Sequence, residues 1–575
     1  MLLLGIFFVT ISNVLYIFPA QVTSMAIDLV SESLNNLLLF GGSDLKNQFF
    51  KDLSLALFLF GLLYIALALI KGFFTYLTRQ TIIVMSRHIE FDLKNEIYAH
   101  YQKLPLSFYR SHNTGDLMSR ISEDVGKVRM YVGPALMYGL NLIILFLVII
   151  PYMFSVNATL AMYTLLPLPV LSLSIYLVSN HMNRLSTAIQ RKLSGLATFV
   201  QEAFSGIRVI KAFANEAHSV SEFDKISNEY RNESLKLNKI NAYFFPVVST
   251  LIGLSTIITI YIGGLEVIKG NISLGNIAEF IIYVNILTWP VTSLGWITSI
   301  VQQASASQKR INEFLDTDSE VINGTKSIDL IGDLRFENVS LTYKDSGIEA
   351  IKNLSFTVKN GETLAILGKT GSGKSTLANL ICRMLDPSSG KISVDNEALM
   401  DLELTYFRNQ LAYVPQESFL FSDTIKNNIL FGNQSLTEND MIEATKNADV
   451  YNNIMDFPDA FDTILGERGI TLSGGQKQRV TIARAIIRKP KILVFDDCLS
   501  AVDTQTEDRI LTNLKTIMQN RTSILISHRA STVKLADKIL VLDKGELAEI
   551  GTHHELYALK PFTKSLLRVV FKQLL

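Results

Sequence analysis

The sequence predicts an all-α membrane domain with six helical spans, followed by an α/β domain that carries a phosphate-binding loop. Three observations support this fold class: six long apolar segments in the first half of the chain, two long basic segments between them, and a glycine-rich loop in the second half. At 575 residues the chain exceeds a single hydrophobic core. Charged residues make up only 18%, against roughly 25% in soluble globular proteins.

The six apolar segments are each close to the roughly 20 residues that cross a bilayer. Helices buried in soluble proteins average about 11–12 residues and are seldom apolar on every face, so that alternative fails. The first segment has no Lys or Arg before it, and we expect a retained membrane helix rather than a cleaved signal peptide. The predicted spans are 2–20, 54–75, 132–153, 158–179, 245–268 and 277–301.

Two long polar loops, 76–131 and 180–244, hold most of the basic residues of the first half. The positive-inside rule therefore puts both loops in the cytosol, and six spans return the chain to the same side. We expect both to be mostly helical, with breaks at 105–115 and 203–210. These breaks are candidate docking elbows for a cytosolic domain, or else simple helical turns.

We predict a membrane domain at 1–315, a polar linker at 316–333 and an α/β domain at 334–575, with short β-rich runs alternating with helical stretches.

The formal net charge is zero, which gives no support to a nucleic-acid partner. Two cysteines, Cys382 and Cys498, are too few for a disulfide framework or a cysteine metal site.

A glycine-rich loop in the second half fits the pattern GxxxxGK[ST], follows an apolar strand at 363–367 and opens a helix. Glycines allow backbone N–H groups to surround phosphates, and the helix N-terminus adds its positive dipole end. Lys374 is expected to contact the β- and γ-phosphates of ATP, and Ser375 to bind Mg²⁺. The loop comprises Gly368, Lys369, Thr370, Gly371, Ser372, Gly373, Lys374, Ser375 and Thr376.

The apolar run 492–495 predicts a strand buried on both faces, and it ends in Asp496 and Asp497. Ligands of parallel α/β sheets bind at the carboxyl ends of the strands. We expect Asp496 to act as an outer-sphere partner of Mg²⁺ and Asp497 to occupy the position of a water-orienting group. The alternative is an unrelated acidic pair on the surface.

A second candidate anion site lies at the start of a basic amphipathic helix, and consists of Leu472, Ser473, Gly474, Gly475 and Gln476. Backbone N–H groups and a hydroxyl at a helix N-terminus bind anions. Because one nucleotide does not need two phosphate sites, we expect this site to serve the ATP held by another copy of the domain.

The string LSGGQKQR, placed between the phosphate loop and the Asp strand, resembles the signature motif of ATP-binding-cassette (ABC) exporters, and the resemblance covers essentially the whole chain. It implies the ABC exporter type of membrane domain, a P-loop ATPase domain, and a dimer that encloses two ATP molecules between phosphate loops and signatures. It also implies roles for Tyr343 (adenine stacking), Gln416 (sensing Mg²⁺ and the membrane domain), the segment Gly466–Arg468 (contact with the cytosolic loops), Ser500, Ala501, Val502 and Asp503 (the loop crossing to the partner site) and His528 (the γ-phosphate switch).

The sequence departs from the family pattern in two places. The usual amphipathic helix before the first span has no counterpart; a different start or a shortened member would explain this. Asp497 stands where the family has Glu, as in the degenerate subunit of heterodimeric exporters; the alternative is drift without consequence. We therefore expect slow hydrolysis at this chain's own site.

Three functions remain open. The leading one is an ATP-driven half-transporter in the bacterial plasma membrane that pairs with a second half-transporter to export drugs or amphiphilic compounds. The second is a homodimeric flippase for a lipid or lipid-linked molecule, and the third a nucleotide-gated regulator or channel. The membrane segments identify no cargo: Trp289 and Trp296 are as compatible with lipid contact as with a pocket, and Glu279 of the sixth span receives no substrate role.

Overall fold

The computed structural model describes residues 1–37, 43–433, 435–466, 469, 471–499, 503–527 and 529–559. The chain forms two compact units. We call the first, which comprises Met1–Gln102 and Gly115–Thr317, the membrane unit. The second, the α/β unit, comprises Asp318–Leu575 together with the short segment Lys103–Thr114, which the contiguous division at 315 and 334 had not included.

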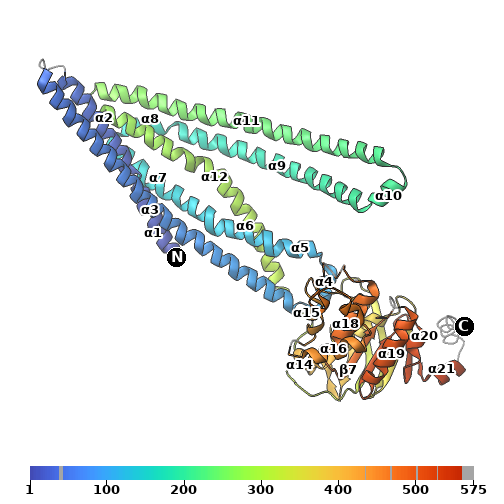
Figure 1. Ribbon diagram of the computed structural model, residues 1–575. Helices are drawn as coiled ribbons and strands as arrows, with labels where there is room; N and C mark the ends of the chain where they lie inside the picture. The colour runs from blue at the N-terminus through green and yellow to red at the C-terminus, as the bar shows by residue number, and fades with distance from the viewer. Residues whose placement is uncertain are drawn as a thin grey trace. The chain divides into compact units, whose positions relative to one another are not determined.

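The membrane unit is all helical (Figure 1). It includes two short π-helical turns, η1 and η2. Among the described residues, six helical segments are long and apolar enough to cross a membrane, which confirms the predicted number of spans. They are Leu2–Leu34, Lys46–Lys103, Thr114–Val156, Ala158–Val178, Glu216–Ile268 and Leu274–Leu315. The helices are α1 (Leu2–Val14), α2 (Ile17–Leu37), α3 (Ser43–Lys103), α5 (Thr114–Ser119), η1 (Arg120–Asp124), α6 (Val125–Met130), η2 (Tyr131–Ala135), α7 (Leu136–Val156), α8 (Ala158–Leu165), α9 (Pro167–Ser205), α10 (Ile207–Ala212), α11 (Glu216–Ile268) and α12 (Leu274–Leu315).

The spans continue as helix far into the two long loops. The 61 residues of α3 correspond to about 90 Å at 1.5 Å per residue. It ends at Lys103, shortly before Pro105, since the residue preceding a proline is pushed out of the helical region. Helices α9 and α11 run side by side as a hairpin with α10 at its end (Figure 1). Helix breaks therefore occur at both predicted elbows.

The core of the membrane unit forms between α7, α8 and α12, where Leu145, Ile149, Leu160 and Phe280 are fully buried. Glu279, to which the sequence gave no substrate role, is also buried in this part of the membrane unit. Its carboxylate accepts hydrogen bonds from Tyr283 (2.8 Å), Asn276 (3.0 Å) and Tyr152 (3.1 Å). Three donors offset the cost of removing a carboxylate from water, so lipid exposure is avoided.

A second buried carboxylate, Asp124 of η1, joins the third and sixth spans. Arg310 forms an ion pair with it, and the Ser307 hydroxyl donates a hydrogen bond of 2.8 Å. Both of these partners lie near the C-terminal end of α12, so the cluster fixes that end of α12 to η1. A π-turn at such a contact is typical of functional positions in helices.

The α/β unit contains two sheets, in agreement with the predicted α/β class. The six-stranded sheet has the order β10-β9-β3-β8-β7-β6 and is parallel except for the edge strand β10; the four-stranded antiparallel sheet has the order β2-β1-β4-β5. Strands β3 and β7 are buried along their whole length, because helices cover both faces of a parallel sheet. The strands are β1 (Leu334–Thr342), β2 (Glu349–Val358), β3 (Thr363–Gly368), β4 (Ser389–Val394), β5 (Glu397–Ala398), β6 (Leu411–Val414), β7 (Ile492–Asp496), β8 (Thr522–Ile526), β9 (Lys538–Asp543) and β10 (Glu546–Gly551).

Helix α4 (Leu106–Ser111), the first elbow, belongs to the α/β unit. Phe108 is buried there, and the Ser107 hydroxyl donates to Glu320 at 3.1 Å. Lys344 also binds Glu320, and that hydrogen bond is the main cause that lowers the pKa of the Glu320 carboxyl. The remaining helices are α13 (Lys374–Ile381), η3 (Leu399–Asp401), α14 (Leu404–Asn409), α15 (Ile425–Leu430), α16 (Glu438–Asn447), α17 (Tyr451–Met455), η4 (Ala460–Asp462), α18 (Gly474–Ile486), α19 (Thr504–Met518), α20 (Ala530–Val533) and α21 (His553–Leu559).

Candidate functional site

The glycine-rich loop connects the carboxyl end of β3 to the first residue of α13. Gly371 and Gly373 have φ values of +80° and +101°, which side chains of L-residues rarely adopt. A Cβ on Gly373 would also lie 2.5 Å from the carbonyl oxygen of Ala350. No side chain caps the N-terminus of α13. Its first N–H groups are therefore available to an anion, as a phosphate site requires.

Lys374 is folded back into this loop. Its ammonium donates to the carbonyl oxygens of Gly368 (2.8 Å) and Lys369 (2.9 Å). Burial lowers the pKa of Lys374, and the nearby charges of Asp496 and Asp497 oppose that shift. An incoming phosphate would replace two neutral acceptors by a charged one, and charge-assisted hydrogen bonds are the stronger kind.

Asp496 and Asp497 follow one another at the end of β7, but their environments differ. Burial is the largest effect on Asp496 and raises the pKa of its carboxyl, while hydrogen bonds from Ser375 and Tyr413 act in the opposite direction. Asp497 has a φ of +46°, and its N–H donates to the carbonyl of Ile526 at 2.8 Å. This left-handed residue allows both carboxylates to line one cavity.

That cavity, which we call the nucleotide cavity, has a volume of about 530 Å³. Of the residues predicted to bind ATP, Gly368, Lys369 and Ser372 do not line it. The hydroxyl groups of Tyr343 and Thr376 are hydrogen-bonded at 3.0 Å. The predicted residues that line it are Tyr343, Thr370, Gly371, Gly373, Lys374, Ser375, Thr376, Gln416, Asp496 and Asp497.

Arg110 of α4 is a cavity residue that the sequence did not assign. Its guanidinium lies 5.0 Å from the centroid of the Tyr343 ring, at a cation–π distance. The sequence predicted a docking elbow at 105–115, but nothing in that segment predicted a contact between its side chains and the Tyr343 ring. The first elbow therefore contributes a side chain to the nucleotide cavity itself.

The five signature residues do not line the nucleotide cavity. Ser473 is the N-cap of α18, and its hydroxyl accepts from the N–H of Gln476, whose side chain accepts from the N–H of Ser473 at 2.9 Å. The hydroxyl oxygen is thus engaged as a cap, while its O–H can still donate. The helix starts at Gly474, so the N-terminus presents its dipole at the motif.

Several predicted residues lie outside the described part of the chain: Ser500, Ala501, Val502, His528, Glu467 and Arg468. Asp503 is described and caps α19 by accepting from the N–H of Thr506 at 3.0 Å. That backbone hydrogen bond is the main cause that lowers the pKa of the Asp503 carboxyl.

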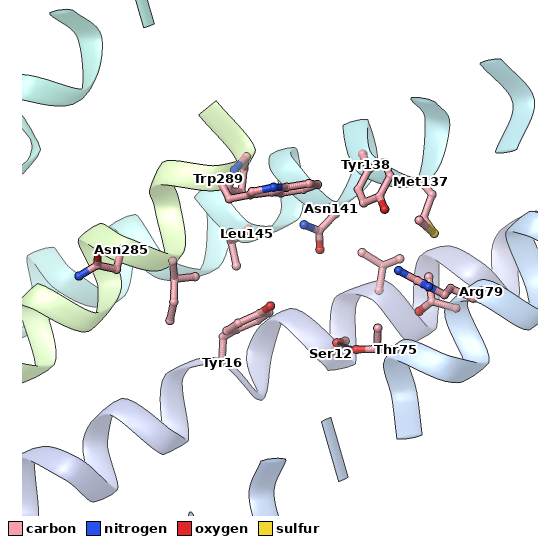
Figure 2. Close-up of a pocket in the computed structure, with 14 residues that line it drawn as sticks. Ser12, Tyr16, Thr75, Arg79, Met137, Tyr138, Asn141, Leu145, Asn285 and Trp289 are labelled. Atoms are coloured by element: carbon pink, nitrogen blue, oxygen red, sulfur yellow. Dashed lines mark hydrogen bonds between the residues drawn. The ribbon is translucent and has the colours of Figure 1, made fainter. Parts of the chain in front are cut away.

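A different cavity, which we call the membrane cavity, lies between α1, α3, α7 and α12 and has a volume of about 320 Å³ (Figure 2). Its walls combine apolar and aromatic side chains with a few polar groups, which is the usual composition of small-molecule sites. The lining residues are Val9, Ser12, Tyr16, Thr75, Thr78, Arg79, Met137, Tyr138, Asn141, Leu145, Asn285, Ile286, Trp289 and Pro290.

A six-span helical domain joined to a phosphate-loop α/β domain with a separate signature defines the ABC exporter architecture. Residues 2–291 match the family model of the ABC transporter transmembrane region, and residues 351–500 match the ABC transporter family model. The chain belongs to the ABC transporter family, and it is a multi-pass membrane ATPase of the exporter type.

Its relatives include the uncharacterized ABC transporter ATP-binding protein YknU of Bacillus subtilis, 37% identical over 86% of this chain and 85% of that protein. A probable multidrug resistance ABC transporter ATP-binding/permease protein, YheI, of the same species is 33% identical over 95% and 91%. An ATP-dependent lipid A-core flippase of Syntrophus aciditrophicus is 31% identical over 98% and 92%. A solved bacterial Atm1-family ABC exporter with ATP bound aligns with a TM-score of 0.76 and 26% identity over 98% of both chains.

Proposed function

We propose that this chain is one subunit of a heterodimeric plasma-membrane exporter that uses ATP, bound and hydrolysed on the cytosolic side, to move drugs or amphiphilic compounds. The observation that carries the heterodimer is Asp497, which lines the nucleotide cavity with a side chain one methylene shorter than the family's Glu. The export of amphiphiles is supported by the membrane cavity, whose lining combines aromatic and polar groups.

In this proposal Tyr343 stacks on adenine, while Lys374 and the N–H groups of the loop hold the phosphates. The Ser375 hydroxyl and the Asp496 carboxylate are hydrogen-bonded to each other, and Gln416 lines the same cavity. These oxygen donors fit Mg²⁺, which prefers hard oxygen ligands and neutralises phosphate charge when bound. Asp497 and His528 act on the water and the γ-phosphate.

Coupling requires a state that only ATP stabilises. Shifting an equilibrium from 1:99 to 99:1 takes about 5.5 kcal/mol of differential binding. Phosphates held by the loop of one subunit and the signature of the other supply such a difference, because only the closed dimer makes both sets of contacts. The separation of Ser473 from the nucleotide cavity of its own chain supports this division of roles.

The α9–α11 hairpin supports docking onto another subunit. Its end, around α10, exposes large apolar side chains: Phe204, Val209 and Phe213 are each more than half exposed. Apolar patches of this kind mark protein–protein contacts. We propose that this elbow docks on the partner's ATPase domain, while α4 docks on the chain's own.

The homodimeric lipid flippase remains a second candidate, favoured by the 31% identity to a lipid A-core flippase over nearly the full chain. A nucleotide-gated regulator or channel is a third. Reconstitution separates them: slow ATP hydrolysis alone and fast hydrolysis in a 1:1 complex with a second half-transporter support the proposal. Fast hydrolysis by a homodimer supports the flippase, and ion current supports the channel.

A further inference from the structure

The membrane cavity has a formal charge at one end. Among its lining residues Arg79 alone is charged, and no acidic residue lines the cavity. Within the described chain no carboxylate pairs with Arg79, and the Asn141 amide has no hydrogen-bond partner either. Figure 2 shows both groups pointing into the same space. Arg79 is an exposed residue just beyond the predicted end of the second span at residue 75. Because its guanidinium has no acidic partner among the lining residues, this end of the cavity favours an anion.

The other groups define the rest of a ligand. Trp289 and Tyr16 lie on opposite walls of the cavity (Figure 2). Tyr138 packs edge-on against Trp289, with ring centroids 5.1 Å apart, and against Trp296 at 5.7 Å. Edge-to-face pairs fix the positions of these rings. A flat or apolar body fits between them, with its charged end at Arg79.

The cavity adjoins a path of further hollows. A second hollow of about 500 Å³ shares Arg79, Met137 and Tyr138 with it. A third, of about 550 Å³, shares Met130 and Trp296 with the second and reaches Lys127. This path runs from the helical extension predicted to be cytosolic toward the membrane cavity, so the ligand has a route of entry from that side.

We infer that the membrane cavity binds small amphiphilic acids, with a carboxylate, sulfonate or phosphate on the Arg79 guanidinium and a flat apolar body between Tyr16 and Trp289. A guanidinium binds such groups through two parallel hydrogen bonds, which an ammonium cannot reproduce. The inference rests on the proposed export function and names its substrate class. The volume of about 320 Å³ suits a single-ring or two-ring compound.

A matched pair of probes tests the charge. Dansylglycine and dansylcadaverine carry the same fluorophore, with a carboxylate on the first and an ammonium on the second. The chain has only two tryptophans, and both, Trp289 and Trp296, line the cavity or its adjoining hollow. The part of the tryptophan-to-dansyl energy transfer that is lost in Trp289→Phe therefore reports binding at this place in the full-length transporter in lipid nanodiscs, whatever tryptophans the partner subunit carries.

Arg79→Gln is expected to weaken dansylglycine binding about 10- to 100-fold, as the loss of a charge-assisted hydrogen bond does, without weakening dansylcadaverine binding. Arg79→Lys should restore part of the affinity. Arg87→Gln is the control: it removes a charge from the same helix, at a residue that pairs with Glu90 and lines neither hollow. Trp289→Phe should reduce the energy transfer at saturating probe and, because this ring forms one wall of the cavity, should also weaken the binding of both probes.

The inference is wrong if dansylcadaverine binds as tightly as dansylglycine to the wild type, or if Arg87→Gln has the same effect as Arg79→Gln. Dihexanoyl phosphatidylglycerol carries a phosphate but has acyl chains instead of a flat body. If it displaces dansylglycine with higher affinity than the probe itself, the ligand is a lipid and the inference is also wrong. ATP hydrolysis by the complex is measured in parallel. If the complex hydrolyses ATP but lacks the anion preference, only the inference fails; if it neither hydrolyses nor transports, the proposed function fails.

Discussion

The nucleotide cavity takes six of its lining residues from one run, 370–376, whereas the membrane cavity takes a few residues from each of four helices. A phosphate site built from backbone N–H groups needs glycines at fixed places, so its chemistry is written at fixed spacing. A cavity built from side chains of packed helices needs only suitable groups on facing turns, and many spacings satisfy that. The ligand of the nucleotide cavity can therefore be predicted from the sequence, whereas the ligand class of the membrane cavity can be inferred only from the structure.

The largest expected effect comes from the signature, which lies outside both cavities and so tests whether the nucleotide cavity of one chain is sufficient for hydrolysis. Ser473→Arg should lower ATP turnover of the heterodimer by about 10³-fold, since loss of one transition-state donor costs about 10²–10³ and the arginine also blocks its neighbours. Lys374→Ala should weaken ATP binding at the slow site and leave some hydrolysis. Steady-state ATPase assays on the purified complex measure both; greater damage from Lys374→Ala would reverse the assignment of competent and slow sites.

The second expected effect concerns reach at Asp497. Its carboxylate stops about 1 Å short of where Glu would place it, and a misplacement of that size costs about 10²-fold in rate. Asp and Glu have similar reference pKa values, about 3.9 and 4.3, so basicity does not account for the difference. Asp497→Glu should raise turnover at this site up to about 10²-fold.

Single-site turnover shows this when the partner's own catalytic Glu has been changed to Gln. The control is Asp497→Asn in the same background, which keeps the short side chain without its charge. Turnover that stays slow with Glu would place the defect in the partner's signature and contradict the argument from reach.

Much of the fold could be read from the sequence, because lipid and phosphate impose strong patterns. The six spans could be predicted from the length of the apolar segments. Strands β3 and β7 could be predicted from short apolar runs, the first followed by the glycine-rich loop and the second by two aspartates. Glu279 could not be placed: its burial depends on hydroxyl groups of Tyr152 and Tyr283, which no local pattern links to it. The docking of α4 on the α/β unit likewise depends on a contact between residues 107 and 320.

The third prediction sharpens the difference between the two carboxylates of the nucleotide cavity. Because burial raises the pKa of Asp496, its carboxylate takes up a proton at a pH above the ordinary value of about 3.9. Binding of Mg²⁺-ATP should therefore weaken as the pH falls toward that raised pKa, by up to about tenfold per pH unit below it. Nucleotide titrations monitored by calorimetry measure this dependence.

Asp496→Asn removes the titrating carboxyl. The phosphates of ATP titrate in the same way with both proteins, so their contribution cancels when the pH profiles of the variant and the wild type are compared. The variant should show weaker binding at neutral pH and a flatter pH profile than the wild type. Equal slopes in the two proteins would show that Asp496 does not titrate in this range.

The smallest expected effect tests Arg110, the one residue of the nucleotide cavity that comes from an elbow of the membrane-spanning half. Its guanidinium occupies a face of the Tyr343 ring, and a cation–π contact at an exposed site is worth about 0.5–1 kcal/mol. If adenine must displace it, Arg110→Ala should tighten ATP binding about two- to fivefold. GTP should gain as much, because the displaced contact is the same, whereas triphosphate, which has no base to stack, should bind unchanged. Arg110→Lys, which keeps a cation on the same helix, is the control and should lie between the two. Weaker ATP binding in Arg110→Ala would mean that Arg110 instead covers the bound base, and the elbow would then sense an occupied cavity by contact rather than by release.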